Sequence, residues 1–163
     1  GLEFYKNKWF LYLIPCLLVP VVEELSCRLF LKKSLINSYI SLSLITFISI
    51  LLFQNRKIYA LDWYVLNTLV FSFVIWTSLF SFKKYLANIK IADRTIFYAS
   101  AVLFSLLHLS NYSFQINESP KYLFLIIPQF FSGLLYGYIR VANGITYSIL
   151  LHSIHNTILI FII

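Results

Sequence analysis

Long apolar stretches separated by short polar segments dominate the chain. Stretches of about 17–25 mostly apolar residues can cross a hydrocarbon core of about 30 Å as α-helices. Six segments fit this pattern, the fourth being the shortest: 8–30, 35–53, 62–82, 95–110, 121–138 and 145–163. Because their apolar and polar residues do not strictly alternate, a lipid-facing β-barrel is excluded. The pattern predicts an all-α fold, a polytopic membrane bundle of about six transmembrane helices.

The amino-acid composition is typical of a protein embedded in the lipid bilayer. Hydrophobic residues make up 60% of the 163 positions, and the mean hydropathy is +0.82. Too few polar residues remain to cover a soluble globule. No repeat or linker divides the sequence, so we expect residues 1–163 to form a single transmembrane domain. Since the chain contains no methionine, we expect it to be truncated at its N-terminus.

The net charge of +7 reflects short basic clusters between apolar segments. This distribution indicates membrane topology and not nucleic-acid binding, which favours one basic face or run. The loops after the first, third and fifth segments hold seven basic residues: Lys32, Lys33, Lys83, Lys84, Lys90, Arg94 and Arg140. The other side holds five: Lys6, Lys8, Arg56, Lys57 and Lys121. The excess places the former loops in the cytoplasm and both chain ends outside.

Three polar clusters interrupt the apolar segments. Ionisable groups inside a membrane are costly and are functional candidates by default. The clusters comprise Glu23, Glu24 and Arg28 on the first segment, Phe104 and His108 on the fourth, and His152 and Asn156 on the sixth. Any one cluster alone is more often structural. Together they would be an expensive way to hold a bundle, since interhelical polar contacts average only about 0.6 kcal/mol, so we interpret them as one active site.

The spacing of these residues along a helix indicates different roles for Glu23 and Glu24. Glu24 and Arg28 are i,i+4 neighbours and can pair, whereas Glu23 points in another direction. A carboxylate without a local cation is the better proton acceptor, which selects Glu23 as the general base.

The two histidine clusters complement that base. His108, packed by Phe104 one turn before it, would hold and deprotonate a water molecule together with Glu23. His152 and Asn156 share one helix face and could donate hydrogen bonds to an oxyanion. His155 is given no role, and Gly133 and Gly137 are expected to allow close helix packing.

These clusters resemble the signatures of the CPBP family of CAAX prenyl proteases and bacteriocin-processing enzymes, also called Abi. Its Glu-Glu-x-x-x-Arg is matched at residues 23–28, its Phe-x-x-x-His at 104–108 and its His-x-x-x-Asn at 152–156. The resemblance implies a glutamate-dependent intramembrane endopeptidase without a cofactor, in which Glu23 and His108 activate water while His152 and Asn156 stabilise the oxyanion. It also implies a multi-pass protein of the bacterial cytoplasmic membrane, acting on membrane-protein or lipidated-peptide substrates.

The sequence departs from the family pattern between its first two motifs. About 80 residues separate them, and the segment at about 35–82 is interpreted as an inserted helical hairpin. Two extra crossings preserve the direction of the fourth segment, but the insertion could cover or replace part of the substrate entry route.

Two other functions remain open. Zinc could bind Glu23, His108 and His152 with water as a fourth ligand, although no His-Glu-x-x-His motif supports this metalloprotease. Alternatively, the same cluster could serve a non-enzymatic bacteriocin-immunity or scaffold protein. A proton-coupled transporter is less attractive, because the sequence lacks repeat symmetry and signals of discontinuous helices.

Overall fold

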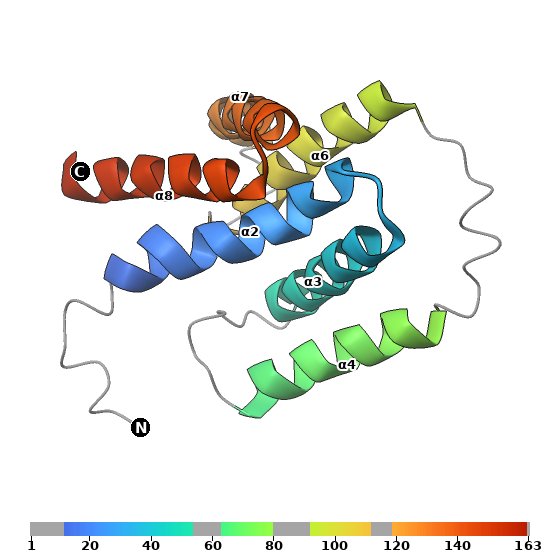
Figure 1. Ribbon diagram of the computed structural model, residues 1–163. Helices are drawn as coiled ribbons and strands as arrows, with labels where there is room; N and C mark the ends of the chain where they lie inside the picture. Colours follow the sequence, from blue (N-terminus) through green and yellow to red (C-terminus); the bar gives the residue numbers. More distant parts are fainter. Residues whose placement is uncertain (1–11, 54–62, 80–91, 112–118, 163) are drawn as a thin grey trace.

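The computed structural model describes residues 12–53, 63–79, 92–111 and 119–162, and all regular structure in these ranges is helical (Figure 1). The elements in chain order are η2 (Ile14–Leu18), α2 (Val19–Arg28), η3 (Leu29–Leu31), α3 (Leu35–Phe53), α4 (Trp63–Leu79), α6 (Asp93–Leu107), η6 (His108–Asn111), α7 (Ser119–Ala142) and α8 (Ile145–Ile162). The all-α prediction is confirmed for these ranges. Each predicted apolar segment overlaps a helix.

Two helices differ from their predicted bounds. Helix α6 begins at Asp93, whose carboxylate suits a helix N-terminus, and its last turn gives way at His108 to the 3-10 helix η6. Helix α7 runs to Ala142, beyond the predicted end. It stops at Gly144, whose positive φ of 112° lets its amide return to the carbonyls of Ile139 and Arg140, as helix C-caps commonly do.

Two helical segments among the described residues are long and apolar enough to cross a membrane, Leu35–Leu52 and Phe124–Ala142. Two further apolar helices, Trp63–Ser78 and Ile145–Phe161, are shorter. Only 33% and 22% of the residues in the two longer segments are buried. Many of their apolar side chains therefore lie at the surface of the bundle, as contact with lipid requires. Six crossings stay a prediction.

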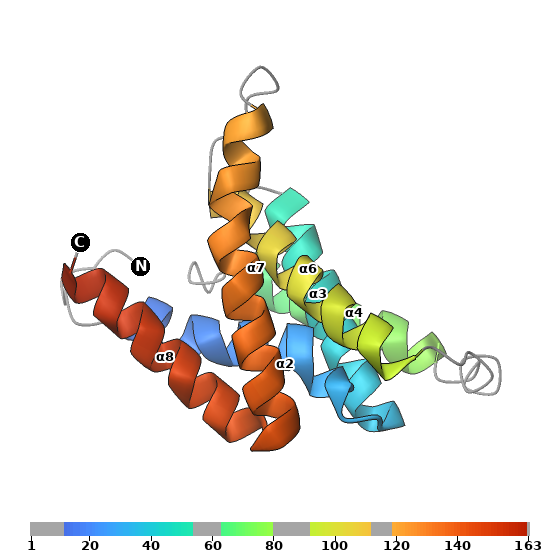
Figure 2. The same ribbon diagram turned by 90° about the horizontal axis from the view of Figure 1, so that it is seen from above.

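Helix α2 occupies the centre of the arrangement. It lies between α8 and α3 in Figure 1 and also contacts α6. Helix α4 packs on α3, with Phe47, Ile48 and Leu51 of α3 and Val65 of α4 forming an apolar cluster. Figure 2 shows the same order from above, with α8 and the α3–α4 hairpin on opposite sides of α2. The predicted hairpin thus packs on the face of α2 away from α8.

Arg140 was counted above as a loop charge, and this assignment is wrong. The residue lies inside α7 and is only 7% exposed. Its guanidinium donates to the backbone carbonyls of Arg28 at 3.2 Å and Leu29 at 3.3 Å. These carbonyls lie where α2 ends and the 3-10 turn η3 begins. Arg140 therefore caps α2, and the charge bias behind the predicted orientation falls to six against five. Of the other counted residues, Lys6, Lys8, Arg56, Lys57, Lys83, Lys84 and Lys90 lie outside the described residues.

Helices α6 and α7 approach closely, and glycines make this approach feasible. A Cβ atom on Gly133 would lie 3.1 Å from the Cα atom of Ala101, and one on Gly137 would lie 3.0 Å from the Phe97 ring. The predicted role of both glycines in close packing is confirmed.

Gly133→Val should separate α6 from α7, because the new side chain meets the backbone of Ala101. We expect a loss of about 1–3 kcal/mol in unfolding free energy, as for other overpacked sites, measured by denaturant titration of the purified protein in mixed micelles. Ala142→Val adds a branched side chain at an exposed position of the same helix and should have little effect. Equal effects of the two substitutions would contradict the packing argument.

Candidate active site

A buried ion pair forms the base of the site. The Nη1 atom of Arg28 lies 2.7 Å from Oε1 of Glu24, and both side chains are completely buried. The two residues are one turn apart on α2, so the helix itself brings them together, as the spacing predicts. A buried pair of this kind persists only where its remaining polar atoms also find suitable neighbours.

Aromatic rings surround the guanidinium of Arg28. Its Cζ atom lies 4.2 Å from the centroid of the Phe104 ring and 5.3 Å from that of Tyr136. Its Nε and Nη2 atoms are buried and make no hydrogen bond with the described residues. The faces of aromatic rings attract such a cation. The rings of Phe104 from α6 and Tyr136 from α7 thus stabilise the guanidinium charge where hydrogen bonds to Nε and Nη2 are lacking.

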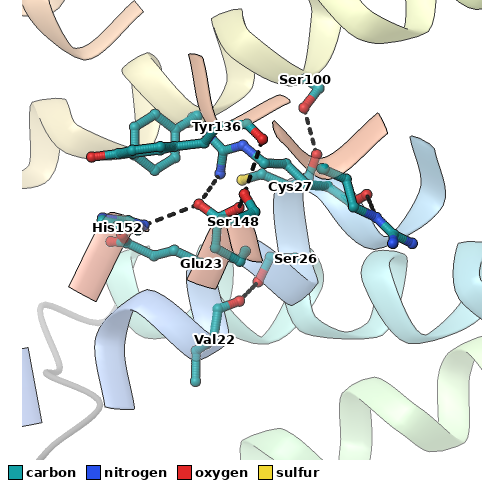
Figure 3. Close-up of polar contacts among 12 residues, drawn as sticks. Val22, Glu23, Ser26, Cys27, Ser100, Tyr136, Ser148 and His152 are labelled. Atoms are coloured by element: carbon teal, nitrogen blue, oxygen red, sulfur yellow. Dashed lines mark hydrogen bonds and ion pairs between the residues drawn. The ribbon is translucent and has the colours of Figure 1, made fainter. Parts of the chain in front are cut away.

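Glu24 joins α2 to α8 through its contacts with His152 and Ser148, the two α8 residues labelled in Figure 3. Its Oε1 atom also lies 3.0 Å from Nδ1 of His152. Its Oε2 atom accepts a hydrogen bond from the hydroxyl of Ser148, which also lies 2.9 Å from the backbone carbonyl oxygen of Tyr136. Both carboxylate oxygens are therefore occupied by partners, and Glu24 serves to connect the helices.

His152 is held on three sides. Because the carboxylate of Glu24 accepts, Nδ1 of His152 carries the hydrogen of their contact. The imidazole stacks on Tyr136, with centroids 4.6 Å apart and an interplanar angle of 18°, and the Phe104 ring packs against it at 5.5 Å in an edge-on arrangement. These contacts aim Nε2 at the neighbouring carboxylate of Glu23, 3.5 Å from its Oε2 atom.

Glu23 contrasts with Glu24. Its side chain is 20% exposed, yet its Oε2 atom is buried and has no hydrogen-bond partner in the part of the chain that the structure describes. The distance to His152 is longer than an ordinary hydrogen bond. The expected difference between the two adjacent carboxylates is thus present: one is saturated by partners, and the other has an oxygen free for a further group.

His108 reaches the same cluster through Phe104. Its Nδ1 atom lies 2.9 Å from the backbone carbonyl of Phe104. A carbonyl oxygen only accepts, so Nδ1 carries a hydrogen and Nε2 of a neutral ring is left as an acceptor. The two rings are 4.4 Å apart, which confirms that Phe104 packs on His108. Since Phe104 also contacts His152, its ring bridges the two histidines.

Asn156 follows His152 by one turn on α8, but its amide has a different partner. The Nδ2 atom donates to the backbone carbonyl of Pro15 at 3.0 Å. One of the two amide hydrogens is therefore committed to the N-terminal end of the first helix. The second remains for another acceptor, and the oxyanion role of Asn156 stays a prediction.

Ser148 and Tyr136 belong to the site but were not predicted from the sequence. Ser148 could have been found, because it precedes His152 by four residues and so extends the polar stripe of α8 that ends at Asn156. Tyr136 gave no such signal, since it is one of many aromatic residues in an apolar helix. Its hydroxyl contacts Nδ1 of His155, so the histidine without a predicted role belongs to the same group.

The zinc alternative takes Glu23, His108 and His152 as its ligands. Among the described residues, which include Glu23, His108 and His152, no three histidine, cysteine, aspartate or glutamate side chains are placed to hold a metal ion.

Comparison with known proteins places this group of residues in a family. The family model described as type II CAAX prenyl endopeptidase Rce1-like matches residues 76–158. The matched segment contains the second and third motifs and begins after Glu23, Glu24 and Arg28. No curated protein and no solved structure matches the chain.

The first motif lies outside the matched segment in the sequence but next to it in the structure. The matched segment begins inside α4, so that α3 and most of α4 separate it from α2, yet Glu24 contacts His152 directly. Because the match covers just over half of the chain and agrees with the resemblance of all three motifs, the chain belongs to the Rce1-like family of type II CAAX prenyl endopeptidases, a family of membrane proteases.

Proposed function

We propose that this protein is an intramembrane endopeptidase of the glutamic type, with Glu23 as its general base. One observation carries the proposal. The buried Oε2 atom of Glu23 lacks a hydrogen-bond partner among the described residues and lies 3.5 Å from Nε2 of His152, whose other nitrogen is held by Glu24. An unsatisfied buried oxygen is costly, and a bound water or substrate group would satisfy it.

Water activation is assigned to Glu23 and His108. The ionised carboxylate of Glu23 takes a proton from the water while its oxygen attacks the carbonyl carbon of the peptide bond. Nε2 of His108 accepts a hydrogen bond from the other O–H of that water and so orients it, which its tautomer permits because Nδ1 donates to Phe104; this O–H stays on the oxygen that adds to the carbonyl carbon. The products of this step are a protonated Glu23 and a tetrahedral oxyanion.

Oxyanion stabilisation is assigned to His152 and Asn156. When the His152 ring is protonated, its Nδ1–H is held by the carboxylate of Glu24 and its Nε2–H can donate to the developing oxyanion. The second N–H of the Asn156 amide adds another donor. When the intermediate collapses, its C–N bond breaks and the proton held by Glu23 passes to the leaving amine.

The substrate class rests on the family description. We assign peptides held at the membrane by a lipid group or a transmembrane segment, with prenylated peptides as the first to test, because the family description names CAAX prenyl endopeptidases. We further assign to the whole chain a single bundle of six crossings in which α3 and α4 are the inserted pair. The packing of this pair on the side of α2 away from α8 supports an entry route that the insertion does not cover.

Glu23→Gln should lower kcat by about 10²–10⁴-fold, because it keeps the shape of the side chain and removes the base. The measurement is cleavage of a farnesylated, internally quenched CAAX peptide by the full chain in proteoliposomes, alongside the same peptide without the lipid. Insertion and thermal stability should remain those of the unsubstituted protein. Full turnover by Glu23→Gln would rule out Glu23 as the base. If the unsubstituted protein cleaved neither peptide, the immunity or scaffold function would be favoured.

Glu24→Gln should instead destabilise the fold. It leaves the completely buried Arg28 without its counter-charge, and loss of one partner of such a pair costs about 3–5 kcal/mol. Asp93→Asn is the matched control. It breaks the exposed ion pair of Asp93 with Lys33, whose side chains are 82% and 61% exposed, and should cost no more than about 1 kcal/mol. Similar unfolding free energies for both variants would contradict the structural role of Glu24.

Tyr136→Leu should lower kcat by on the order of tenfold with little change in KM, because it removes the flat surface that fixes the His152 ring. Tyr136→Phe keeps the stacking and should restore most of the activity. Tyr138→Leu changes a 64% exposed tyrosine of the same helix and should leave turnover unchanged. The stacking argument fails if Tyr136→Phe is as impaired as Tyr136→Leu.

A further inference from the structure

The first helix contains a break in its hydrogen-bond ladder. Residues Ile14–Leu18 form a π-helical turn, in which the amide of Val19 bonds to the carbonyl of Ile14. Single π-turns within α-helices are uncommon and occur frequently at functional sites. This one ends two residues before a proline and three turns before Arg28.

The break leaves the carbonyl of Pro15 without a backbone donor. An α-helical bond to this oxygen would come from the amide of Val19, which is committed to Ile14. A π-helical bond would come from residue 20, which is a proline and has no N–H. Pro20 is completely buried, whereas Pro15 is half-buried and its contact with Asn156 is partly buried. A carbonyl without a helical donor is satisfied by a side chain or by water.

Asn156 satisfies this carbonyl from another helix. Its Nδ2 atom lies 3.0 Å from the Pro15 oxygen, across 141 positions of sequence. Helices α2 and α8 run antiparallel, and their polar contacts follow one another along the seam: Glu24 with Ser148, Glu23 with His152, then Pro15 with Asn156. The last contact fixes the end of the seam where the predicted oxyanion donors lie.

We propose that Pro20 is a positioning residue: by withholding a backbone N–H it reserves the Pro15 carbonyl for Asn156, and this bond orients the Asn156 amide and sets the register of His152 against Glu23. The catalytic part of this inference rests on the proposed function. The bond itself does not, so the two can be tested separately.

The bond can be observed through one labelled peptide unit. Pro15–Cys16 is the only Pro–Cys step in the sequence, so carbonyl-¹³C proline and ¹⁵N cysteine give a single correlated signal from the full chain in lipid nanodiscs. The carbonyl shift of that signal reports hydrogen bonding to the Pro15 oxygen. The variants are Asn156→Leu, Pro20→Ala and both together, and Pro128→Ala, which alters the exposed proline inside α7, serves as the matched control.

Asn156→Leu should shift the Pro15 carbonyl signal when Pro20 is present. In the Pro20→Ala background the shift should be at most half as large, because the amide of residue 20 then supplies a donor. Pro128→Ala should leave the response to Asn156→Leu unchanged. If Asn156→Leu failed to insert, Asn156→Ala would give the same comparison. A response that is absent, or equal with and without Pro20, would overturn the proposal.

Turnover tests the catalytic part. With the farnesylated peptide, Pro20→Ala should lower kcat about tenfold at unchanged KM, since a small misplacement of catalytic groups is costly, and Pro128→Ala should not. Full kcat in Pro20→Ala would overturn the positioning role and leave Glu23 as the base. If the unsubstituted chain cleaved nothing while the carbonyl responded as expected, the proposed function and its catalytic extension would fail, and the reserved bond would stand.

Discussion

A guanidinium group without access to solvent has to be neutralised and enclosed by the bundle itself, and most of the site follows from this requirement for Arg28. Its charge is balanced by Glu24 on the same helix, and its faces are covered by Phe104 and Tyr136 from two others. The carboxylate that balances it also holds His152 of a fourth helix. The residues proposed to act on substrate are thus placed by a group that does not itself act on it.

The parts of this arrangement that depend on one helix could be predicted from the sequence. Pairing of Glu24 with Arg28, and the different situation of Glu23, follow from the 100° turn between successive residues. The packing of Phe104 on His108 is likewise local. The glycines Gly133 and Gly137 predicted that another helix packs closely there. They could not identify that helix, because the spacing of small residues shows which helix face can be approached but not which element approaches it.

The remaining features depend on how distant segments meet, and no periodicity encodes that. Arg140 stands near the end of an apolar segment, as loop charges do, yet it donates to two carbonyls at the end of α2. In the sequence, Tyr136 is one of many aromatic residues in apolar helices. Its role is visible only in the fold, where His152 of α8 stacks on it. The partner of Asn156 is a backbone oxygen exposed by a π-turn, which side-chain patterns cannot reveal.

The separation between Glu24 and its partner Ser148, 124 positions along the chain, has a consequence for biosynthesis. Chains are made from the N-terminus, so α2 is completed well before the ribosome reaches α8. Isolated charges at the centre of a membrane helix oppose insertion by about 2.5–3.5 kcal/mol each. Arg28 lies four residues after Glu24, and therefore both ions emerge together and can neutralise each other at once. In the proposed bundle of six crossings, this ion pair would keep α2 in lipid until α8 is synthesised.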